Sequence, residues 1–415
     1  MTLARAAHVV ALLFVTLAFQ SASAGNARAQ TPPSIESRYP SILRDAIAAF
    51  RAGDPVTAEK ALRAQAPGNP DAEAWLGVVL ADRGQDRDAL KALQHAADAG
   101  SAEANHRLAL AFAEGRLGLV RDDARAAQLF EKAASAGHQR AQINLGLLYL
   151  RGRGVARDLV QARAWLEKAA AGDEPNALYA LGRAMEESHG PVAADSVRAA
   201  DLYRRAAEKG HALAALRYGL ALSDGLGVKR DPVAAQRLLL QAQASGVPEA
   251  ALALGDIAAR TPATRDKAAN ARIVEIAITW YQAAANAGVP SAQFKLANAY
   301  FAGAGIARDP VQALRWYGRA AQQGLPEAEH ALGVMTMGGV AGPADPVEGY
   351  KWLTLAERAG YPDSRPIRDK AREQISATDR DKAEALANAF APTLERPIDD
   401  SVPRLAPVPA PAAKP

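Results

Sequence analysis

Apolar and small side chains recur at helical spacing along most of the chain. The most regular stretch is residues 291–326, in which Ala292, Leu296 and Tyr300 stand at i, i+4 and i+8. This spacing places their side chains on one face of a helix. We therefore expect an amphipathic helix in the first half of this stretch.

A turn and a second helix follow in the same stretch. Gly303 and Gly305 interrupt the helical pattern, and Asp309-Pro310 comes shortly after them. Asp is a good N-cap and Pro suits the first helical position, while Gln312 completes a capping box. The sequence thus predicts a second helix that begins at Pro310. The same Asp device recurs at Asp158, Asp231 and Asp345.

The second helix carries one bulky residue between two small ones, as in Ala313, Trp316 and Ala320. The same three positions recur elsewhere as Ala162/Trp165/Ala169, Ala277/Trp280/Ala284 and Gly349/Trp352/Ala356. A tryptophan between two alanines on one helix face fits a packing core better than a sugar-stacking surface. We interpret these tryptophans as core residues of a repeated unit.

Two series of glycines define the length of this unit. One closes each second helix and the other lies within each first helix, and both recur about every 36 residues with one longer gap. The first series is Gly100, Gly137, Gly172, Gly210, Gly246, Gly288, Gly324 and Gly360, and the second is Gly146, Gly182, Gly219, Gly255, Ala297 and Gly333. A fixed period in this range is typical of stacked repeat proteins.

The combined pattern A-x-x-x-L-G-x-x-Y-x-x-G-x-G-V…D…A-x-x-W-x-x-x-A-A-x-x-G resembles the Sel1-like repeat, a relative of the tetratricopeptide repeat. Neither helix of a unit can bury its apolar stripe alone, so the units must stack. We predict an all-α protein, a right-handed α-solenoid of stacked antiparallel helix pairs with a concave surface. Regular copies cover 141–175, 212–248, 291–326 and 327–362, and weaker ones cover 101–140, 176–211 and 249–290.

Six segments are predicted along the chain. Residues 1–29 combine Arg5, a short apolar run and small-x-small sites ending at Ala24 and Ala29, as a secretory signal peptide does. The apolar run is too short to span a membrane, so we expect a periplasmic or secreted protein without a membrane span once the signal is cleaved. The other segments are a linker (30–40), tetratricopeptide-like helices (41–100), the Sel1-like array (101–363), capping helices (364–391) and a Pro-rich disordered tail (392–415).

Composition supports this assignment and narrows the chemistry. The 415 residues include 100 alanines and no cysteine. Ala has the highest helix propensity and allows helices to approach closely, while the lack of Cys removes disulfides, thiolate metal sites and cysteine nucleophiles. The net charge of +4 comes without a basic patch, which argues against nucleic-acid binding.

Catalytic and cofactor signatures are missing from the sequence. There is no G-x-S-x-G elbow, no phosphate-binding loop and no H-E-x-x-H. Some Sel1-like proteins are described as β-lactamases, but no serine here begins the S-x-x-K motif of the serine enzymes. His106 and His330 occupy equivalent slots of distant repeats, and His138 and His211 follow exit glycines. We therefore predict no catalytic residue, no cofactor and no metal site.

The predicted function is protein binding. Mixed charges and amides on the first helices, opposite the packing residues, suit a polar interface with a partner protein along the concave face. The candidate partner-binding residues are Asn144, Arg151, Arg217, Asp224, Arg260 and Lys295. The resemblance to Sel1-like proteins implies a role in envelope signalling or complex assembly. A cell-wall-directed enzyme or peptidoglycan-binding module and a secreted effector stay open as alternatives. So do the oligomeric state and the roles of the irregular loops 186–191 and 260–267.

Overall fold

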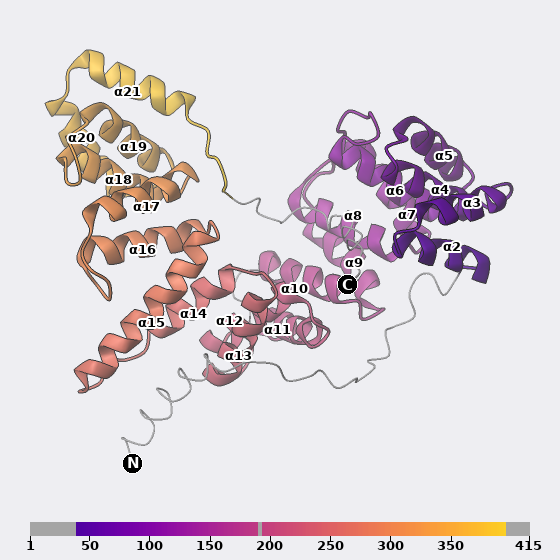
Figure 1. Ribbon diagram of the computed structural model, residues 1–415, viewed down its shortest axis with the longest axis horizontal. Helices are drawn as coiled ribbons and strands as arrows, with labels where there is room; N and C mark the ends of the chain where they lie inside the picture. Colours follow the sequence, from indigo (N-terminus) through magenta and orange to yellow (C-terminus); the bar gives the residue numbers. More distant parts are fainter. Residues whose placement is uncertain (1–38, 190–192, 396–415) are drawn as a thin grey trace. The chain divides into compact units, whose positions relative to one another are not determined.

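The chain forms helix pairs, as the pattern of apolar positions predicts. The computed structural model describes residues 39–189 and 193–395, which contain 20 α-helices, α2–α21, and no strand (Figure 1). The all-α class of stacked antiparallel helix pairs is confirmed for these residues. The predicted signal peptide, most of the linker and residues 396–415 of the predicted tail lie outside them.

Each repeat contributes a first and a second helix that pack on each other and on the neighbouring repeat. The first helices are α4 (Pro70–Asp82), α6 (Ala102–Glu114), α8 (Gln139–Arg151), α10 (Pro175–His189), α12 (Ala212–Asp224), α14 (Glu249–Ala259), α16 (Pro290–Ala302) and α18 (Pro326–Gly338). The second helices are α5 (Asp86–Asp98), α7 (Asp123–Ser135), α9 (Leu159–Ala170), α11 (Ala193–Glu208), α13 (Pro232–Ala244), α15 (Lys267–Asn286), α17 (Pro310–Gln322) and α19 (Pro346–Arg358).

Further helices stand before and after these pairs. They are α2 (Ser41–Arg51) and α3 (Pro55–Gln65) at the start, and α20 (Ser364–Gln374) and α21 (Ala377–Ala389) at the end. The described residues divide into two compact units. We call 39–218 with 225–229 the N-terminal unit, and 219–224 with 230–395 the C-terminal unit.

The second helices begin where the Asp residues predict. The Asp309 carboxylate accepts hydrogen bonds from the backbone N–H groups of Val311 and Gln312, both at 3.0 Å. These groups have no partner within the helix, so the side chain satisfies them. Asp158, Asp231 and Asp345 cap their helices in the same way. The predicted N-caps are confirmed.

The centre of the core lies one residue beyond the predicted tryptophans. In α17 the buried residues are Ala313, Tyr317, Ala320 and Ala321, while Trp316 is only half-buried. Trp165 and Trp280 are half-buried likewise, and Trp352 is buried. The apolar stripe of such a helix is more than 100° wide, so the tryptophan lies at its edge and packs beside the core.

Each glycine within a first helix makes room for the bulky core residue of the second helix. A Cβ on Gly146 would lie 2.6 Å from Cγ of Leu166, and one on Gly333 would lie 2.8 Å from Cγ of Leu353. Real Cβ atoms essentially never come this close. The same close approach occurs at Gly77, Gly182 and Gly255, and a Cβ on Gly219 would lie slightly farther away, 3.0 Å from Cγ of Leu239. These glycines therefore set the distance between the two helices of a repeat.

The Gly-x-Gly turns pack against the preceding repeat. Gly154 has φ +70°, and a Cβ there would lie 2.1 Å from the carbonyl oxygen of Asp123. Arg153, which stands between Gly152 and Gly154, donates to both carboxylate oxygens of Asp123, at 3.0 and 2.8 Å. These hydrogen bonds hold the pKa of Asp123 at about 2. The turn thus links its own repeat to the second helix before it.

The two irregular loops differ in their structure. Residues 186–189 continue α10 and are therefore helical, while 190 and 191 lie outside the described residues. Residues 260–266 form a connection that ends at the N-cap Asp266, whose side chain accepts from Ala268 and Ala269. The helix that follows, α15, has 20 residues. The extra length of this repeat therefore lies largely in a longer helix.

The first residues of the predicted disordered tail are ordered against the repeats. Residues 392–395 follow α21 and hydrogen-bond to α17 and its C-cap. The prediction of disorder from Pro392 onward is therefore wrong for these four residues. Within the described part of the chain, no helix has the length and apolar character that crossing a bilayer requires.

Candidate interaction surface on the first helices

Four of the candidate residues take part in three ion pairs between neighbouring first helices. Arg217 of α12 lies 3.8 Å from Glu186 of α10, and Lys295 of α16 lies 3.1 Å from Asp256 of α14. Arg217 and Lys295 each keep 38% of their side-chain surface exposed. They are therefore linked to the adjacent repeat and still accessible.

The third pair joins two candidates to each other. Arg260, at the C-cap of α14, donates to Asp224, the last residue of α12, at 3.0 Å. Both are exposed, with 68% and 40% of their side-chain surfaces accessible. Arg151, the last residue of α8, is also exposed. Five of the six candidates thus lie at least partly at the surface.

Asn144 lies in the interior instead. It is 2% exposed, and its Nδ2 is 3.3 Å from Nε2 of His106 on the preceding first helix. The sequence pattern puts Asn144 opposite the packing residues, but α8 packs on α7, α9 and α10, so the buried face of α8 is wider than one stripe. The prediction that Asn144 belongs to the exposed surface is wrong.

A three-residue connection (136–138) between α7 and α8 positions His138, which the sequence pattern places only after an exit glycine. Gly137, with φ +83°, ends α7, and the His138 N–H donates to the carbonyl of Ala133 as in a Schellman motif. His138 is then the N-cap of α8, because its Nδ1 accepts from the backbone N–H of Ala141 at 3.2 Å. Because Nδ1 accepts this hydrogen bond, Nε2 is the ring nitrogen that can donate.

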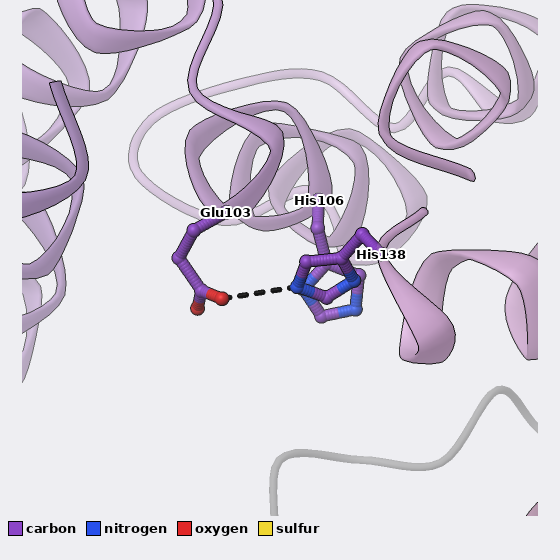
Figure 2. A group of neighbouring side chains, drawn as sticks. All are labelled: Glu103, His106 and His138. Atoms are coloured by element: carbon purple, nitrogen blue, oxygen red, sulfur yellow. Dashed lines mark hydrogen bonds and ion pairs between the residues drawn. The ribbon is translucent and has the colours of Figure 1, made fainter. Parts of the chain in front are cut away.

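The other nitrogen of His138 faces a buried acid. Its Nε2 lies 3.0 Å from the Glu103 carboxylate, and the ring stacks on His106 with centroids 4.4 Å apart (Figure 2). Arg107 donates to the other oxygen of Glu103 at 2.5 Å. We call Glu103, His106, Arg107, His138 and Asn144 the Glu103 cluster. All five are buried, with 2% to 6% of their surface exposed.

The charges in the Glu103 cluster are balanced by its geometry. Burial favours the neutral acid, but the charge of Arg107 and the hydrogen bond from His138 outweigh burial and hold the pKa of Glu103 well below its usual range. Burial and the proximity of His138 hold the pKa of His106 well below its usual value. The cluster therefore combines a Glu103–Arg107 ion pair with a neutral His106.

Among the residues that the structure describes, Glu103, His106 and His138 form the group that could bind a metal, since one ligand atom of each lies within 4.8 Å of the others. A ligating histidine directs a ring nitrogen at the ion within the plane of its ring. Here the rings of His106 and His138 are stacked at only 24° to each other. Both nitrogens of His138 are also engaged, one by the helix cap and one by Glu103. These residues fit a hydrogen-bonded joint between repeats and do not fit a metal centre.

Sequence reasoning missed this cluster because it compared histidines in equivalent slots. His106 and His330 are indeed in distant repeats, but His106 and His138 come from adjacent ones. The sequence feature that could have revealed the cluster is a pair of complementary polar residues separated by about one repeat length. Glu103 and His138 are 35 positions apart, and Asn144 and His106 are 38 apart. The exposed pair Arg260–Asp224 shows the same separation, at 36.

Comparison with known proteins agrees with the observed repeats. The model of the Sel1 repeat family matches seven segments, residues 102–138, 139–174, 175–211, 212–246, 274–289, 290–325 and 326–361. A Sel1 repeat protein from Oxalobacter formigenes has a similar structure, with a TM-score of 0.55 and 25% identity. That similarity covers 87% of this chain and 98% of the other.

Two curated proteins show partial sequence similarity. One is the ERAD-associated E3 ubiquitin-protein ligase component HRD3B of Arabidopsis thaliana, 36% identical over 101 residues, which are 24% of this chain. The other is chitin synthase regulatory factor 3 of Schizosaccharomyces pombe, 30% identical over 224 residues, which are 52% of this chain. The matched segments span only 16% and 24% of the lengths of these relatives.

Proposed function

Because the chain belongs to the Sel1 repeat family, we propose that it is an exported, non-enzymatic scaffold that binds a partner protein along its first helices. The proposal includes a place in the periplasm or outside the cell, in envelope signalling or complex assembly. Export is supported by the signal-like pattern of residues 1–29.

The observation that carries the proposal is the set of half-exposed ion pairs between first helices. Exposed ion pairs contribute only about 0–1 kcal/mol to stability. A partner can therefore replace one member of such a pair at small cost to the fold. Arg217 and Lys295 each present a cation in this way, one in each unit.

The chemistry of the Glu103 cluster supports a scaffold over an enzyme. A general acid or base needs a pKa near the working pH and access to a substrate. The pKa values of Glu103 and His106 both lie well below their usual values. Both side chains are also buried. The hydrogen bonds and ring stacking of the cluster instead hold α6 and α8 together.

The names of the two curated relatives point in the same direction. One is called a component of a ligase and the other a regulatory factor of a synthase. Each name describes a protein that acts together with another. This supports a binding role for the shared repeats, with a partner that the two names do not identify for this chain.

Charge reversal on the first helices tests the proposal. The chain with Arg217→Glu and Lys295→Glu should capture less partner from a periplasmic extract than the unaltered chain, at an unchanged melting temperature. Arg315→Glu is the matched control, because Arg315 is exposed on the second helix α17. Equal capture by the double variant and the control would refute the assignment of the surface. Cell fractionation tests export separately. Recovery of the protein in the cytoplasmic fraction would contradict the proposed export.

A further inference from the structure

A short extended segment at the end of the described chain is bound to α16 and α17 of its own C-terminal unit by side chains and backbone together. Residues 392–395, which we call the strap, follow α21 and run across the end of α17. The Thr393 N–H donates to the carbonyl of Gln322 at 2.8 Å. Carbonyls in the last turn of a helix have no partner within it, so the strap satisfies one of them.

The side chain of Glu395 fixes the strap at its far end. Arg319 of α17 donates to both oxygens of this carboxylate, at 2.8 and 2.5 Å. Gln293 of α16 donates to the same carboxylate at 3.0 Å. A bidentate arginine recognises the planar shape of a carboxylate as well as its charge. The pKa of Glu395 is accordingly held below its usual value.

The groups that hold Glu395 are themselves held in place. Gln293 is completely buried, and its side-chain oxygen accepts from Nε2 of Gln323 at 2.9 Å. The oxygen of Gln323 accepts from the Glu395 N–H at 3.2 Å. Arg319 lies over the ring of Trp316, 4.4 Å from its centroid, and this stacking orients the guanidinium. Such preorganisation is typical of a binding site.

Successive residues of the strap face the repeats and the solvent in turn, as they do in a bound extended peptide. The backbone N–H groups of Thr393 and Glu395 both donate to the repeats. Leu394 between them is exposed. Pro392 lies over Gly324, where a Cβ would come within 3.1 Å of the proline ring. The site therefore recognises an extended backbone and one carboxylate side chain, and Gly324 of the site leaves room for the proline ring.

We propose that Gln293, Arg319 and Gln323 form a peptide-binding site for an extended segment that carries a glutamate, and that the strap fills this site within its own chain. The ligand is a segment of a partner protein with this chemistry, which competes with the strap. The site goes beyond the first-helix surface, since Arg319 and Gln323 belong to α17 and its C-cap. It does not depend on the proposed function.

The experiment measures binding of a fluorescein-labelled peptide with the sequence of residues 391–397 to the full chain. In the unaltered chain the strap competes at an effective concentration in the millimolar range, as expected of a short tether. Glu395→Arg places a second cation beside Arg319 and should release the strap. We expect the peptide to bind this variant at least about tenfold more tightly than the unaltered chain.

Two further variants make the result specific. Adding Arg319→Glu to Glu395→Arg restores opposite charges within the chain, so the strap should return and peptide binding should be lost. Adding Arg315→Glu to Glu395→Arg should leave peptide binding unchanged, because Arg315 lies on the same helix away from the strap contacts. Equal peptide binding by the unaltered chain and Glu395→Arg would overturn the proposal.

Two measurements on the unaltered chain complete the test. The Thr393 amide should exchange slowly with solvent, and free exchange would overturn the bound strap without relying on a variant. Sedimentation should show no dimer that depends on Arg319. A dimer that is lost in Arg319→Glu would assign the site to the strap of a second copy and would overturn the commitment to a partner protein.

Discussion

The same Gly-to-Ala change should have opposite effects on stability at two positions of adjacent helices. Gly318 lies within α17, and a Cβ there would meet nothing within 4 Å. Gly333 lies within α18, and a Cβ there would lie 2.8 Å from Cγ of Leu353 and 3.0 Å from the carbonyl oxygen of Gly349. The first site is open, and the second is closed partly by backbone that cannot rotate away.

The magnitudes follow from these two environments. Ala is better than Gly in a helix interior by about 0.8–1 kcal/mol, so Gly318→Ala should stabilise by about that amount. At Gly333 the same gain is opposed by overpacking, which typically costs about 1–3 kcal/mol. The net effect of Gly333→Ala is a destabilisation of about 1 kcal/mol, within a range of about 0–2 kcal/mol.

Urea denaturation of the full chain, followed by circular dichroism at 222 nm, measures the change. Long repeat arrays can lose two-state behaviour, so amide exchange of α18 and α19 provides a local measure of the same effect. Exchange should be faster in Gly333→Ala and slower or unchanged in Gly318→Ala. If both variants are stabilised equally, the glycine in the first helix does not set the helix separation and our account of the repeat core fails.

Three further predictions concern packing and pH. Ala320→Leu, at a fully buried position, should lower stability by about 1–3 kcal/mol in a thermal melt, while Ala307→Leu in the exposed turn should change little; equal effects would contradict the packing register. Burial lowers the pKa of His211 to about 4, so the unfolded chain takes up the proton first and stability falls as pH drops from about 6.5 to 4. His211→Asn, which can keep the helix cap, should show a smaller loss of stability between pH 7.5 and pH 4.5 in urea titrations. A loss equal to that of the unaltered chain would contradict this prediction. Burial raises the pKa of Glu329 to about 7, so the unfolded chain loses this proton first and stability falls as pH rises from about 4.5 to 7. In urea titrations, Glu329→Gln should therefore stabilise the chain at pH 8 and much less at pH 5. No gain in stability at pH 8 would contradict this prediction.

The repeat architecture could be predicted because its signals are local. Asp309 and its equivalents cap helices through residues two and three positions away. The glycine series recurs with the repeat, so its period could be read without knowing any contact. The tryptophan slot was misjudged by one residue because Trp316 at i+3 and Tyr317 at i+4 both fall on the stripe that begins at Ala313. Only packing decides which of the two lies at its centre.

The functional residues were harder to predict because their partners come from the next repeat. Asn144 looked like a polar surface residue, yet His106 in the preceding repeat gives its amide a buried partner. The Glu103–His138 bond likewise joins residues 35 positions apart. A search for complementary polar residues about one repeat apart would have found these contacts. Glu395 and Gln293 are 102 positions apart in the sequence. Glu395 lies outside the repeats, so the repeat period could not predict this contact.

The most direct test of the central claim is photo-crosslinking of the full chain in living cells. A photoreactive phenylalanine analogue replaces Lys295 on the first helix α16 in one variant, and Arg315 on the second helix α17 in the other. Both positions are at least partly exposed, so the two variants differ mainly in which face carries the probe. We predict a discrete adduct with a partner protein from position 295 and none from position 315. An adduct from position 315 alone would contradict the account.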